Sequence, residues 1–488
     1  MAIPAEQAPT AALLRGLAGA APIETHISAV FVGADTVWKL RKAVRLTFLD
    51  FTPLAERERT ARRELALNAA AAPGMYRDVV PVVRRPDGGL ALGGEGEVVD
   101  WVLRMARVPE ANFLDAIAAR GGLDGRMLDA LGDAVAAYHA ALPPAAGDAV
   151  AAMAGFIAGN RDSALSAGLD PARVRAWEAA ARAALAGRAG WLRARQAAGF
   201  VRRCHGDLHL GNLCLWQGRP APFDALEFDE ALATIDTGYD LAFLLMDLER
   251  RTGRPAANQV LNRYVARTAD AGLVGGLPLY LSLRAMVRAH VEARSGRPRA
   301  AADYLDRAEA ALRPAPACVL AIGGLPGTGK STLARALAPE LGPAPGALVL
   351  RSDEIRKRRH GAAPETRLPP AAYTPEASRV VFAELARLVG EAAGLGHAVI
   401  ADATFMDPAH RAAVAAAAGS TPFRGVWLQA PLAVLEARVA ARVGDASDAD
   451  LAVLRRAAAA DPGAGDWLAV EAADGAAALA ALRRAVPA

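Results

Sequence analysis

Short apolar runs separated by polar turns dominate the chain up to residue 105. Their alternation of apolar and polar positions is typical of half-buried strands. One segment, at 53–72, instead has helical spacing with charged residues on one face. Several strands around a single helix predict a small mixed lobe. The strand-like runs lie at 23–44, 79–84, 89–92 and 97–105.

Beyond residue 105 the pattern changes to long, alanine-rich helical segments. They lie at 111–120, 125–142, 147–166 and 171–198, and further helical pattern continues to about Arg313. We therefore expect one two-lobed domain over residues 1–313, with an N-lobe at about 23–105 and a C-lobe at about 108–313. The sequence Arg-Pro-Ala-Pro-Ala at 313–317 predicts a linker that its prolines stiffen.

The remaining residues, 314–488, alternate strand-like and helical segments. The strand-like runs after the first one lie at 347–351, 397–401 and 424–429. Such alternation predicts an α/β domain with a parallel sheet. Functional side chains of such a sheet lie at the carboxyl ends of its strands, where the sequence has Asp353 and Asp402.

The strongest motif opens this last domain. Residues 319–333, VLAIGGLPGTGKSTL, contain G-x-x-x-x-G-K-S between an apolar run and a helix-forming run. Loop N–H groups and the helix N-terminus can surround phosphate oxygens, Lys330 can reach the β- and γ-phosphates, and Ser331 can hold Mg²⁺. A glycine-rich turn without a ligand is the alternative, but strand, loop, Lys-Ser and helix are all in place. We predict that ATP binds through Gly324, Leu325, Pro326, Gly327, Thr328, Gly329, Lys330, Ser331 and Thr332.

Composition excludes several classes of protein. A net charge of +4 over 488 residues gives no indication of nucleic acid binding. No apolar run is long enough to span a membrane, and the N-terminus lacks the pattern of a secretory signal. Cys204, Cys214 and Cys318 lack metal-ligand spacing and indicate a reducing compartment. We expect a cytoplasmic protein, and the sequence indicates no oligomeric state.

Lysine is rare, since only four of the 56 basic residues are lysines: Lys39, Lys42, Lys330 and Lys357. Where arginine serves nearly every cationic purpose, a remaining lysine indicates a place that needs a compact ammonium group. The phosphate-binding loop explains Lys330. Lys39 and Lys42 need a different explanation.

A second motif lies in RRCHGDLHLGNLCLW, 202–216. Residues 205–212 read H-x-D-x-x-x-x-N, which is the spacing of a kinase catalytic loop. In that chemistry Asp207 takes or orients the proton of an attacking hydroxyl group, and Asn212 ligates Mg²⁺. A second metal-binding acid is expected after the next turn, where the sequence has Asp224, with Glu227 as an alternative. In a purely structural explanation, His205 and Asp207 would cap a turn and Asp224 would be an acidic residue of a hairpin.

HGDLHLGN at 205–212, FDALEF at 223–228 and YDLAFL at 239–244 resemble the aminoglycoside phosphotransferase-like kinases, which have a protein-kinase-like fold. The resemblance covers about residues 23–310. It implies that Asp207 is the catalytic base and that Asn212 and Asp224 hold metal. It also implies that Lys39, in TVWKL, contacts the α- and β-phosphates and pairs with Glu64, with Lys42 as the competing lysine. The glycine-rich phosphate loop of protein kinases is not evident.

In RSDEIRK, Asp353 and Arg356 suggest a base for an acceptor hydroxyl group and a cation for an anionic group beside it. Alternatively, Asp353 only stabilises the N-terminus of a helix. Asp402 follows an apolar strand, as a metal-binding Walker B acid does. This layout, with DATF at 402–405, resembles small-substrate P-loop kinases such as gluconate kinase, polynucleotide 5′-kinase and zeta-toxin-like kinases. That resemblance implies two lid arginines four apart on one helix face, Arg438 toward the substrate and Arg442 toward ATP.

The whole chain resembles bacterial two-domain proteins in which an aminoglycoside phosphotransferase-like domain precedes a P-loop ATP-binding domain. We expect an ATP- and Mg²⁺-dependent phosphotransferase with two sites, each acting on a small hydroxylated molecule. Two alternatives stay open: one domain regulates the other, or the P-loop domain is a polynucleotide 5′-kinase. The small net charge and the lack of an aromatic-basic stripe do not favour nucleic acid as a partner. The acceptors are not identified by the sequence.

Overall fold

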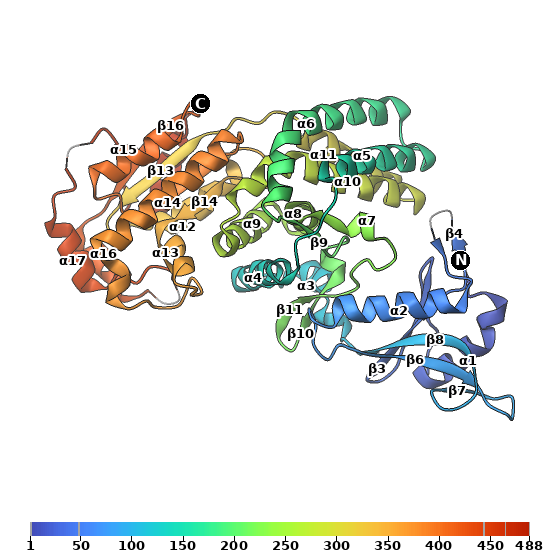
Figure 1. Ribbon diagram of the computed structural model, residues 1–488. Coiled ribbons are helices and arrows are strands. Elements are labelled where there is room, and N and C mark those ends of the chain that lie inside the picture. The colour runs from blue at the N-terminus through green and yellow to red at the C-terminus, as the bar shows by residue number, and fades with distance from the viewer. Residues whose placement is uncertain (1, 47–48, 443–444, 464, 488) are drawn as a thin grey trace. The chain divides into compact units, whose positions relative to one another are not determined.

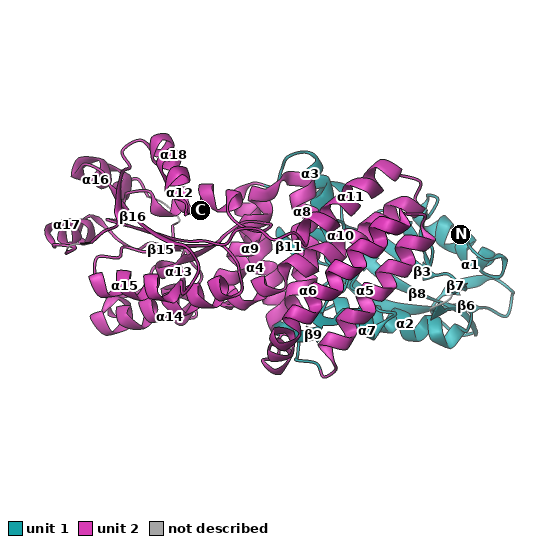
Figure 2. Cartoon of the chain, turned by 90° about the horizontal axis from the view of Figure 1, so that it is seen from above, with its two compact units in different colours: residues 1–123, 141–145, 201–235 teal, residues 124–140, 146–200, 236–488 magenta. Residues whose placement is uncertain are grey.

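The structure is a computed structural model that describes residues 2–46, 49–442, 445–463 and 465–487. The chain forms two compact units (Figure 2). The first consists of residues 1–123, 141–145 and 201–235, and the second of residues 124–140, 146–200 and 236–488. The second unit thus combines the C-lobe helices with the whole P-loop part.

A six-stranded antiparallel sheet of order β1-β2-β3-β8-β6-β7 organises the first unit (Figure 1). Helix α1 packs on one face and helix α2 on the other, because successive strand residues point to opposite faces. Val102, for example, contacts the α1 side and Leu103 the α2 side. The elements are α1 (Ala8–Ala18), β1 (Ile23–Glu24), β2 (Ser28–Val32), β3 (Thr36–Arg41), β4 (Arg45–Leu46), β5 (Leu49–Asp50), α2 (Leu54–Asn68), β6 (Tyr76–Arg84), β7 (Leu90–Leu92) and β8 (Glu97–Ala106).

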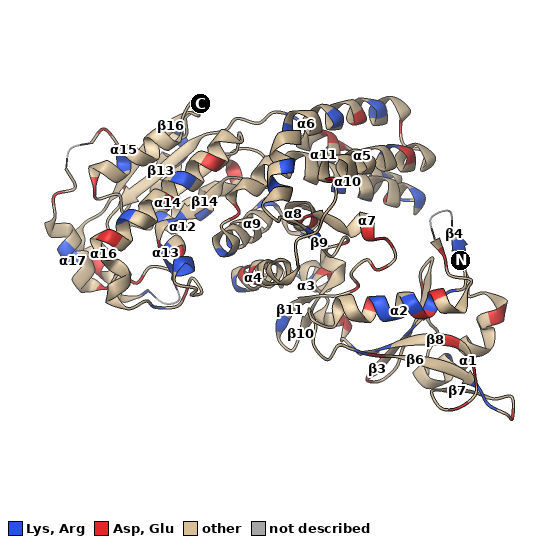
Figure 3. Ribbon diagram, in the orientation of Figure 1, with Lys and Arg blue, Asp and Glu red and all other residues tan. Residues whose placement is uncertain are grey.

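Helix α2 is rich in charged residues (Figure 3), of which Arg57 and Glu64 are buried. Arg59 and Arg62 are exposed, whereas Ala61 is buried. The unit also contains α3 (Leu114–Ala119), β9 (Val201–Arg203), β10 (Leu213–Trp216), β11 (Arg219–Pro222), α7 (Glu230–Ala233) and most of β12 (Thr234–Asp236). Strands β10 and β11 form a hairpin whose two turn residues, Gln217 and Gly218, have positive φ angles of 51° and 78°. These angles suit the tight turn that the sequence predicts before Asp224.

Seven helices of the predicted C-lobe belong mainly to the second unit. They are α4 (Gly125–Ala141), α5 (Ala149–Ser166), α6 (Pro171–Ala197), α8 (Thr237–Thr252), α9 (Arg254–Thr268), α10 (Leu277–Arg294) and α11 (Pro298–Ala311). Helix α8 is the central one, since residues 237–248 are all buried. It packs against α9 and α10.

The P-loop part is a five-stranded parallel sheet of order β14-β15-β13-β16-β17. Helices α12 and α18 cover one face, and α14 and α15 contact the strands as well. The strands are β13 (Val319–Gly324), β14 (Leu348–Arg351), β15 (Val399–Asp402), β16 (Phe423–Gln429) and β17 (Leu468–Glu471). The helices are α12 (Lys330–Leu337), α13 (Ser352–Arg359), α14 (Pro375–Gly394), α15 (Pro408–Ala417), α16 (Leu432–Ala440), α17 (Leu451–Ala459) and α18 (Gly475–Ala485).

The predicted fold class is confirmed, because a mixed lobe is followed by helices and then by a parallel α/β sheet. The fifth strand of that sheet, β17, was not predicted. The domain boundary at 313/314 stays a prediction, because the compact units divide the chain differently. Every helix in the described ranges is too short or too polar to traverse a lipid bilayer.

Candidate active sites

The first candidate site is built around Lys39, in the middle of β3. Its Nζ donates to Glu64 Oε1 at 2.7 Å and to Asp224 Oδ1 at 2.6 Å. Burial disfavours the charged ammonium group, but the carboxylates of Asp224 and Glu64 outweigh burial and raise the pKa of Lys39. The structure thus places Lys39 beside Glu64 of helix α2, its predicted partner, and beside Asp224, the predicted metal ligand.

The competing lysine, Lys42, lies elsewhere. It follows the last residue of β3, is fully buried, and donates from Nζ to Glu24 Oε2 at 2.7 Å and to Thr25 O at 2.8 Å. Its charge is therefore used within the fold of the N-lobe. Lys39 is the lysine whose geometry suits a phosphate contact.

Asp224 is held by a strained backbone. Its φ angle is 60°, in the left-handed region, which is uncommon for residues other than glycine and clusters at functional sites. Its N–H group donates to Tyr76 Oη at 2.9 Å, and the next N–H group, of Ala225, donates to Asn68 Oδ1 at 3.0 Å. Burial opposes ionisation, yet the Lys39 ammonium group keeps the pKa of Asp224 below its usual value. The carboxylate is 43% exposed, so it is ionised and accessible to a cation.

Glu227, the alternative metal ligand, is buried and forms an ion pair with Arg41. Arg41 also donates to Glu64 Oε2 at 2.6 Å. Burial raises the pKa of Glu64 to about 7, although Lys39 and Arg41 act in the opposite direction. Glu227 is therefore part of a buried charge network, which leaves Asp224 better placed for metal. Sequence reasoning missed Arg41, and its position two residues after Lys39 was the available signal.

The predicted catalytic loop is closed by its own side chains. Asn212 Nδ2 donates to the backbone oxygen of Asp207 at 2.9 Å and to Asp207 Oδ2 at 3.0 Å. The buried His205 donates from Nε2 to Phe223 O at 2.8 Å and so ties the loop to the residue before Asp224. Because Nδ2 of Asn212 faces Asp207, Oδ1 is its atom for a metal ion.

The Asp224 carboxylate and the Asn212 amide oxygen are oxygen donors of the kind that Mg²⁺ prefers. The side chains of Asp207 and Asp224 are each 43% exposed, so both can meet a ligand. Lys39 supplies the positive charge that nucleotide phosphates need. These residues therefore fit Mg²⁺ and a nucleotide.

The second candidate site is a cavity of about 810 Å³ at the carboxyl end of the parallel sheet. The loop needs its glycines: Gly327 and Gly329 have φ angles of 87° and 86°, and a Cβ atom on Gly324 would collide with Leu428 O. The predicted residues that line this cavity are 326–332, Asp353, Arg356, Asp402, Arg438 and Arg442. The structure thus brings nearly all of the second predicted set into one cavity.

Lys330 spans the phosphate-binding loop. Its Nζ donates to Gly324 O at 2.8 Å and to Leu325 O at 3.0 Å. Burial lowers its pKa, and the carboxylates of Asp402 and Asp353 only partly oppose this effect. The ammonium group is therefore held at the loop, where it can contact phosphate oxygens.

The metal-binding side of the cavity is formed by Ser331 and Asp402. Ser331 Oγ donates to Asp402 Oδ2 at 2.5 Å, and Arg351 Nε donates to the same oxygen at 3.2 Å. Arg351 pairs with Asp402 in the register of β14 and β15. A hydroxyl group and a carboxylate in contact at the end of a P-loop fit Mg²⁺. Arg351 was not predicted, although its place directly before Ser352-Asp353 was a signal.

Asp353 lies in the first turn of α13 and lines the cavity. Burial raises the pKa of its carboxyl group, and the neighbouring Arg351 offsets this only in part. A raised carboxyl pKa suits a residue that takes a proton near neutral pH. Stabilisation of the helix N-terminus stays an alternative role for Asp353, because the residue lies in the first turn of α13 as well as in the cavity wall.

Arg356 is 6% exposed and donates from Nη1 to Ala372 O at 2.6 Å and from Nη2 to Ser378 Oγ at 3.3 Å. Its guanidinium carbon lies 4.8 Å from the ring centroid of Tyr373. Its Nε is buried and lacks a hydrogen-bond partner among the described residues. Arg356 lines the cavity, so its guanidinium group supplies positive charge to that wall.

The two predicted lid arginines do not share a helix face, so that prediction is wrong. Helix α16 ends at Ala440, which places Arg438 inside it and Arg442 beyond its end. Arg438 donates from Nη1 to Ala472 O at 2.9 Å and from Nη2 to Ala473 O at 2.6 Å. Arg442 Nη1 is buried without a hydrogen-bond partner in the described part of the chain. Their roles toward substrate and ATP stay predictions.

The fourth lysine, Lys357, makes contacts that were not predicted from the sequence. Lys357 is fully buried and donates to Asp448 Oδ2 at 2.5 Å and to Thr366 O. Tyr373 donates its hydroxyl hydrogen to the same Asp448 oxygen. Because Tyr373 and Asp448 both line the cavity, this lysine fastens its wall. The rarity of lysine was the signal.

Two family models match the chain. One, described as phosphotransferase enzyme family, covers residues 29–273, which is half of the chain. The other, described as AAA domain, covers residues 319–460. The chain is 30% identical over 449 residues to uncharacterized proteins of Mycobacterium tuberculosis (strain ATCC 25618 / H37Rv) and Mycobacterium bovis (strain ATCC BAA-935 / AF2122/97), which covers 87% of this chain and 87% of each relative.

The chain therefore belongs to the phosphotransferase enzyme family, and a P-loop kinase-like domain follows its kinase-like domain. This confirms both resemblances that the motifs indicate. Similar solved structures include the GDP and kanamycin complex of APH(2")-IIia, at 13% identity over 60% of this chain and 92% of that chain, with a TM-score of 0.38. A gluconokinase from Sinorhizobium meliloti 1021 is 22% identical over 35% of this chain and 94% of that chain, with a TM-score of 0.25.

Proposed function

We propose that the protein is an ATP- and Mg²⁺-dependent phosphotransferase with two active sites, each of which transfers the γ-phosphoryl group to a small hydroxylated acceptor. The first site uses Lys39 for the phosphates and Asp207 for the acceptor hydroxyl group. The second uses the phosphate-binding loop with Lys330, and Asp353 for its acceptor.

One observation carries this proposal: each unit holds its own complete set of a lysine, metal-ligating oxygens and an acceptor-side carboxylate. In the first unit the set is Lys39, Asn212, Asp224 and Asp207, and in the second it is Lys330, Ser331, Asp402 and Asp353. A purely regulatory domain would not need its acceptor-side carboxylate.

Phosphoryl transfer depends mainly on positioning and on charge stabilisation. Bound Mg²⁺ would neutralise charge on the β- and γ-phosphates. Asp207 and Asp353 would orient an acceptor hydroxyl group and take its proton. Arg356 favours a second-site acceptor that carries an anionic group, because this cationic residue lines the cavity together with Asp353. A small molecule is the proposed acceptor, since a net charge of +4 gives no support to nucleic acid.

Replacement of the two lysines tests whether the sites are separate. Lys39→Ala should abolish nucleotide turnover at the first site alone, and Lys330→Ala should abolish it at the second alone, because each removes the cation that contacts the phosphates. The measurement is nucleotide binding and turnover of labelled ATP with each variant, with hydroxylated metabolites screened as acceptors.

Exposed basic residues near each lysine provide matched controls. Arg84→Ala in the same sheet and Arg335→Ala on α12 each remove a positive charge that is about half exposed, and they should leave turnover unchanged. If Lys330→Ala silences both sites, one domain regulates the other and the proposal of two independent sites fails.

A further inference from the structure

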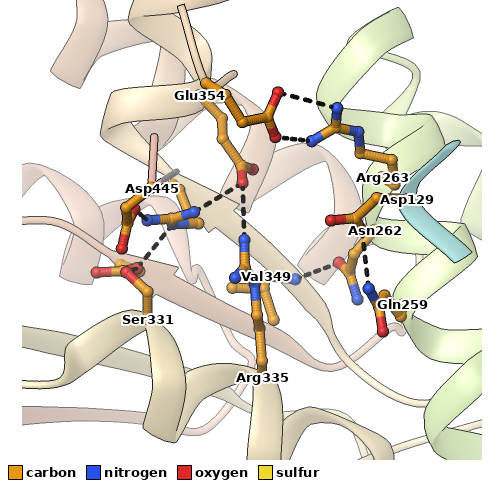
Figure 4. Close-up of polar contacts among 12 residues, drawn as sticks. Asp129, Gln259, Asn262, Arg263, Ser331, Arg335, Val349, Glu354 and Asp445 are labelled. Atoms are coloured by element: carbon orange, nitrogen blue, oxygen red, sulfur yellow. Dashed lines mark hydrogen bonds and ion pairs between the residues drawn. The ribbon is translucent and has the colours of Figure 1, made fainter. Parts of the chain in front are cut away.

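Helix α9 of the kinase C-lobe lies against the edge strand β14 of the P-loop sheet, within the second unit. The amide group of Asn262 contacts this edge with both of its polar atoms. Its Oδ1 accepts from Val349 N at 2.6 Å, and its Nδ2 donates to Ala347 O at 3.2 Å (Figure 4). Asn258, one turn earlier, donates to Ala347 O at 3.0 Å.

These contacts imitate a further strand. The Val349 N–H group and the Ala347 carbonyl group flank Leu348, and in a parallel sheet such a pair bonds to the peptide groups of a neighbouring strand. The Asn262 side chain offers one acceptor and one donor in the same arrangement. An edge strand otherwise leaves such groups unpaired within the sheet. Asn262 therefore fixes the position of β14 from outside the sheet.

Strand β14 ends in Arg351, two residues beyond Val349. Arg351 is 4% exposed and donates to Asp402 Oδ2 at 3.2 Å and to Asp445 Oδ1 at 2.8 Å. Asp402 in turn accepts from Ser331 Oγ at 2.5 Å. The α9 amide is thus connected to the predicted metal ligands through its contact with Val349, the backbone of β14 and the contacts of Arg351. Figure 4 labels Asn262, Val349, Asp445 and Ser331 of this series.

Other contacts fasten the same helix to the P-loop part. Arg263 donates to Asp133 Oδ2 at 2.6 Å and to Glu365 Oε1 at 2.7 Å, so it joins α4 to the segment after α13. Arg358, on α13, donates to Ala266 O of α9 at 3.0 Å. Several polar contacts therefore hold α9 to the P-loop part, and among the described residues of this helix Asn262 is the one that bonds to the strand itself.

We propose that Asn262, assisted by Asn258, is a positioning residue of the P-loop site. By fixing β14 it holds Arg351 against Asp402, and Arg351 holds the Asp402 carboxylate where Ser331 and Mg²⁺ need it. A helix of the first kinase domain is in this way part of the metal-binding machinery of the second. This inference rests on the proposed function, since it assumes that the P-loop site binds Mg²⁺ and ATP.

The test is Asn262→Ala in full-length protein that also carries Lys39→Ala, so that turnover comes from the P-loop site. The Mg²⁺ concentration for half-maximal ATP hydrolysis should rise about tenfold, as expected when a residue that orients a metal ligand is removed. Affinity for ATP without Mg²⁺ should stay within about twofold, because the loop and Lys330 are not on β14. In the protein without nucleotide, hydrogen exchange of the Val349 amide should become faster.

Gln259→Ala is the matched control. Gln259 lies on α9 beside these residues, but it donates to Gly125 O at 2.7 Å and to Asp129 Oδ1 at 2.9 Å within the C-lobe (Figure 4). Its replacement should leave the Mg²⁺ dependence unchanged. Where Asn262→Ala does not fold, Asn258→Ala removes the bond to Ala347 O and the bond that Asn258 Oδ1 accepts from Asn262 Nδ2, but leaves the bond between Asn262 and Val349. It should raise the Mg²⁺ requirement less, by about threefold, since neutral hydrogen bonds each contribute modestly.

An unchanged Mg²⁺ dependence in the folded Asn262→Ala or Asn258→Ala variant would overturn the inference. A loss that Gln259→Ala reproduces would overturn it too, because the effect would then come from α9 in general. Failure of the proposed function has a different signature: Lys330→Ala added to Lys39→Ala would bind ATP as tightly as the Lys39→Ala parent protein.

Discussion

Asp207→Asn is expected to lower phosphoryl transfer at the first site by about 10²–10⁴-fold, the usual contribution of general acid–base catalysis. The substitution removes the group that takes the acceptor proton. The amide oxygen of asparagine can still accept from Asn212 Nδ2, which lies 3.0 Å from Asp207 Oδ2, so the loop should keep its shape. The measurement is transfer of label from ATP to the acceptor that a metabolite screen identifies.

Affinity for ATP and Mg²⁺ separates this role from metal binding. It should persist in Asp207→Asn, because Lys39, Asn212 and Asp224 remain. Asp224→Asn should instead weaken binding of the magnesium–nucleotide complex, because it removes the ionised ligand that Lys39 contacts at 2.6 Å. Unchanged turnover in Asp207→Asn would contradict the kinase interpretation of residues 205–224.

Asp353→Asn should lower transfer at the second site by a similar factor, about 10²–10⁴-fold. ATP affinity should barely change, since the loop backbone, Lys330 and Ser331 provide the phosphate contacts. Slow hydrolysis by water should also persist, because water does not use the acceptor pocket. Transfer, ATP binding and melting temperature of the variant are the quantities to measure.

The pH dependence of transfer gives a second measurement of the same residue. Burial raises the pKa of Asp353, and a base acts only when it is ionised. The rate should therefore fall as the pH falls through this raised pKa, at a higher pH than for an exposed aspartate. Asp353→Asn should remove this acid limb from the pH–rate profile.

A purely helix-terminal role predicts a different result. Loss of a favourable charge in the first turn of a helix costs about 0.3–1 kcal/mol of stability and leaves turnover intact. Glu376→Gln is the control, since Glu376 lies in the first turn of α14 and its side chain is 69% exposed. Wild-type turnover with a melting temperature lowered as in this control would refute the catalytic assignment.

Patterns that are local in sequence predicted their structures well. Residues 319–333 form the expected strand, glycine-rich loop and helix start. The residues that specify such a loop are close together in the sequence. The catalytic loop at 205–212 is similar, since Asn212 bonds to Asp207 only five residues away. The long helices also lie within a few residues of their predicted ranges.

Features that depend on distant partners could not be predicted. The bond between Asn262 and Val349 joins residues 87 positions apart, and nothing near either residue indicates the other. Strand β17 was missed because it is a four-residue edge strand, and Val470 is its one buried residue, so its apolar residues do not show the burial pattern of a strand. The end of α16 at Ala440 has no proline or glycine to mark it before Arg442.

The rarity of lysine, by contrast, was an informative signal, because each of the four lysines makes specific polar contacts. Lys42 and Lys357 are fully buried, and each donates to a carboxylate and a backbone carbonyl group. Lys39 contacts two carboxylates, and Lys330 contacts two carbonyl oxygens of the loop. A compact ammonium group with several donors fits such places better than a planar guanidinium group.

Because the chain has four lysines and two of them are fully buried, an amine-acylating reagent should modify few of its side chains. An acyl-phosphate derivative of ATP transfers its acyl group to an amine near the phosphates, and only Lys39 and Lys330 lie at a candidate nucleotide site. Peptide mass spectrometry of the labelled native protein should find the acyl group on these two lysines, and excess ATP should protect both. Acylation of Lys42 or Lys357 would show that the interior opens, because both side chains are fully buried. Two peptides of one digest would thus report the occupancy of the two proposed nucleotide sites in the same sample.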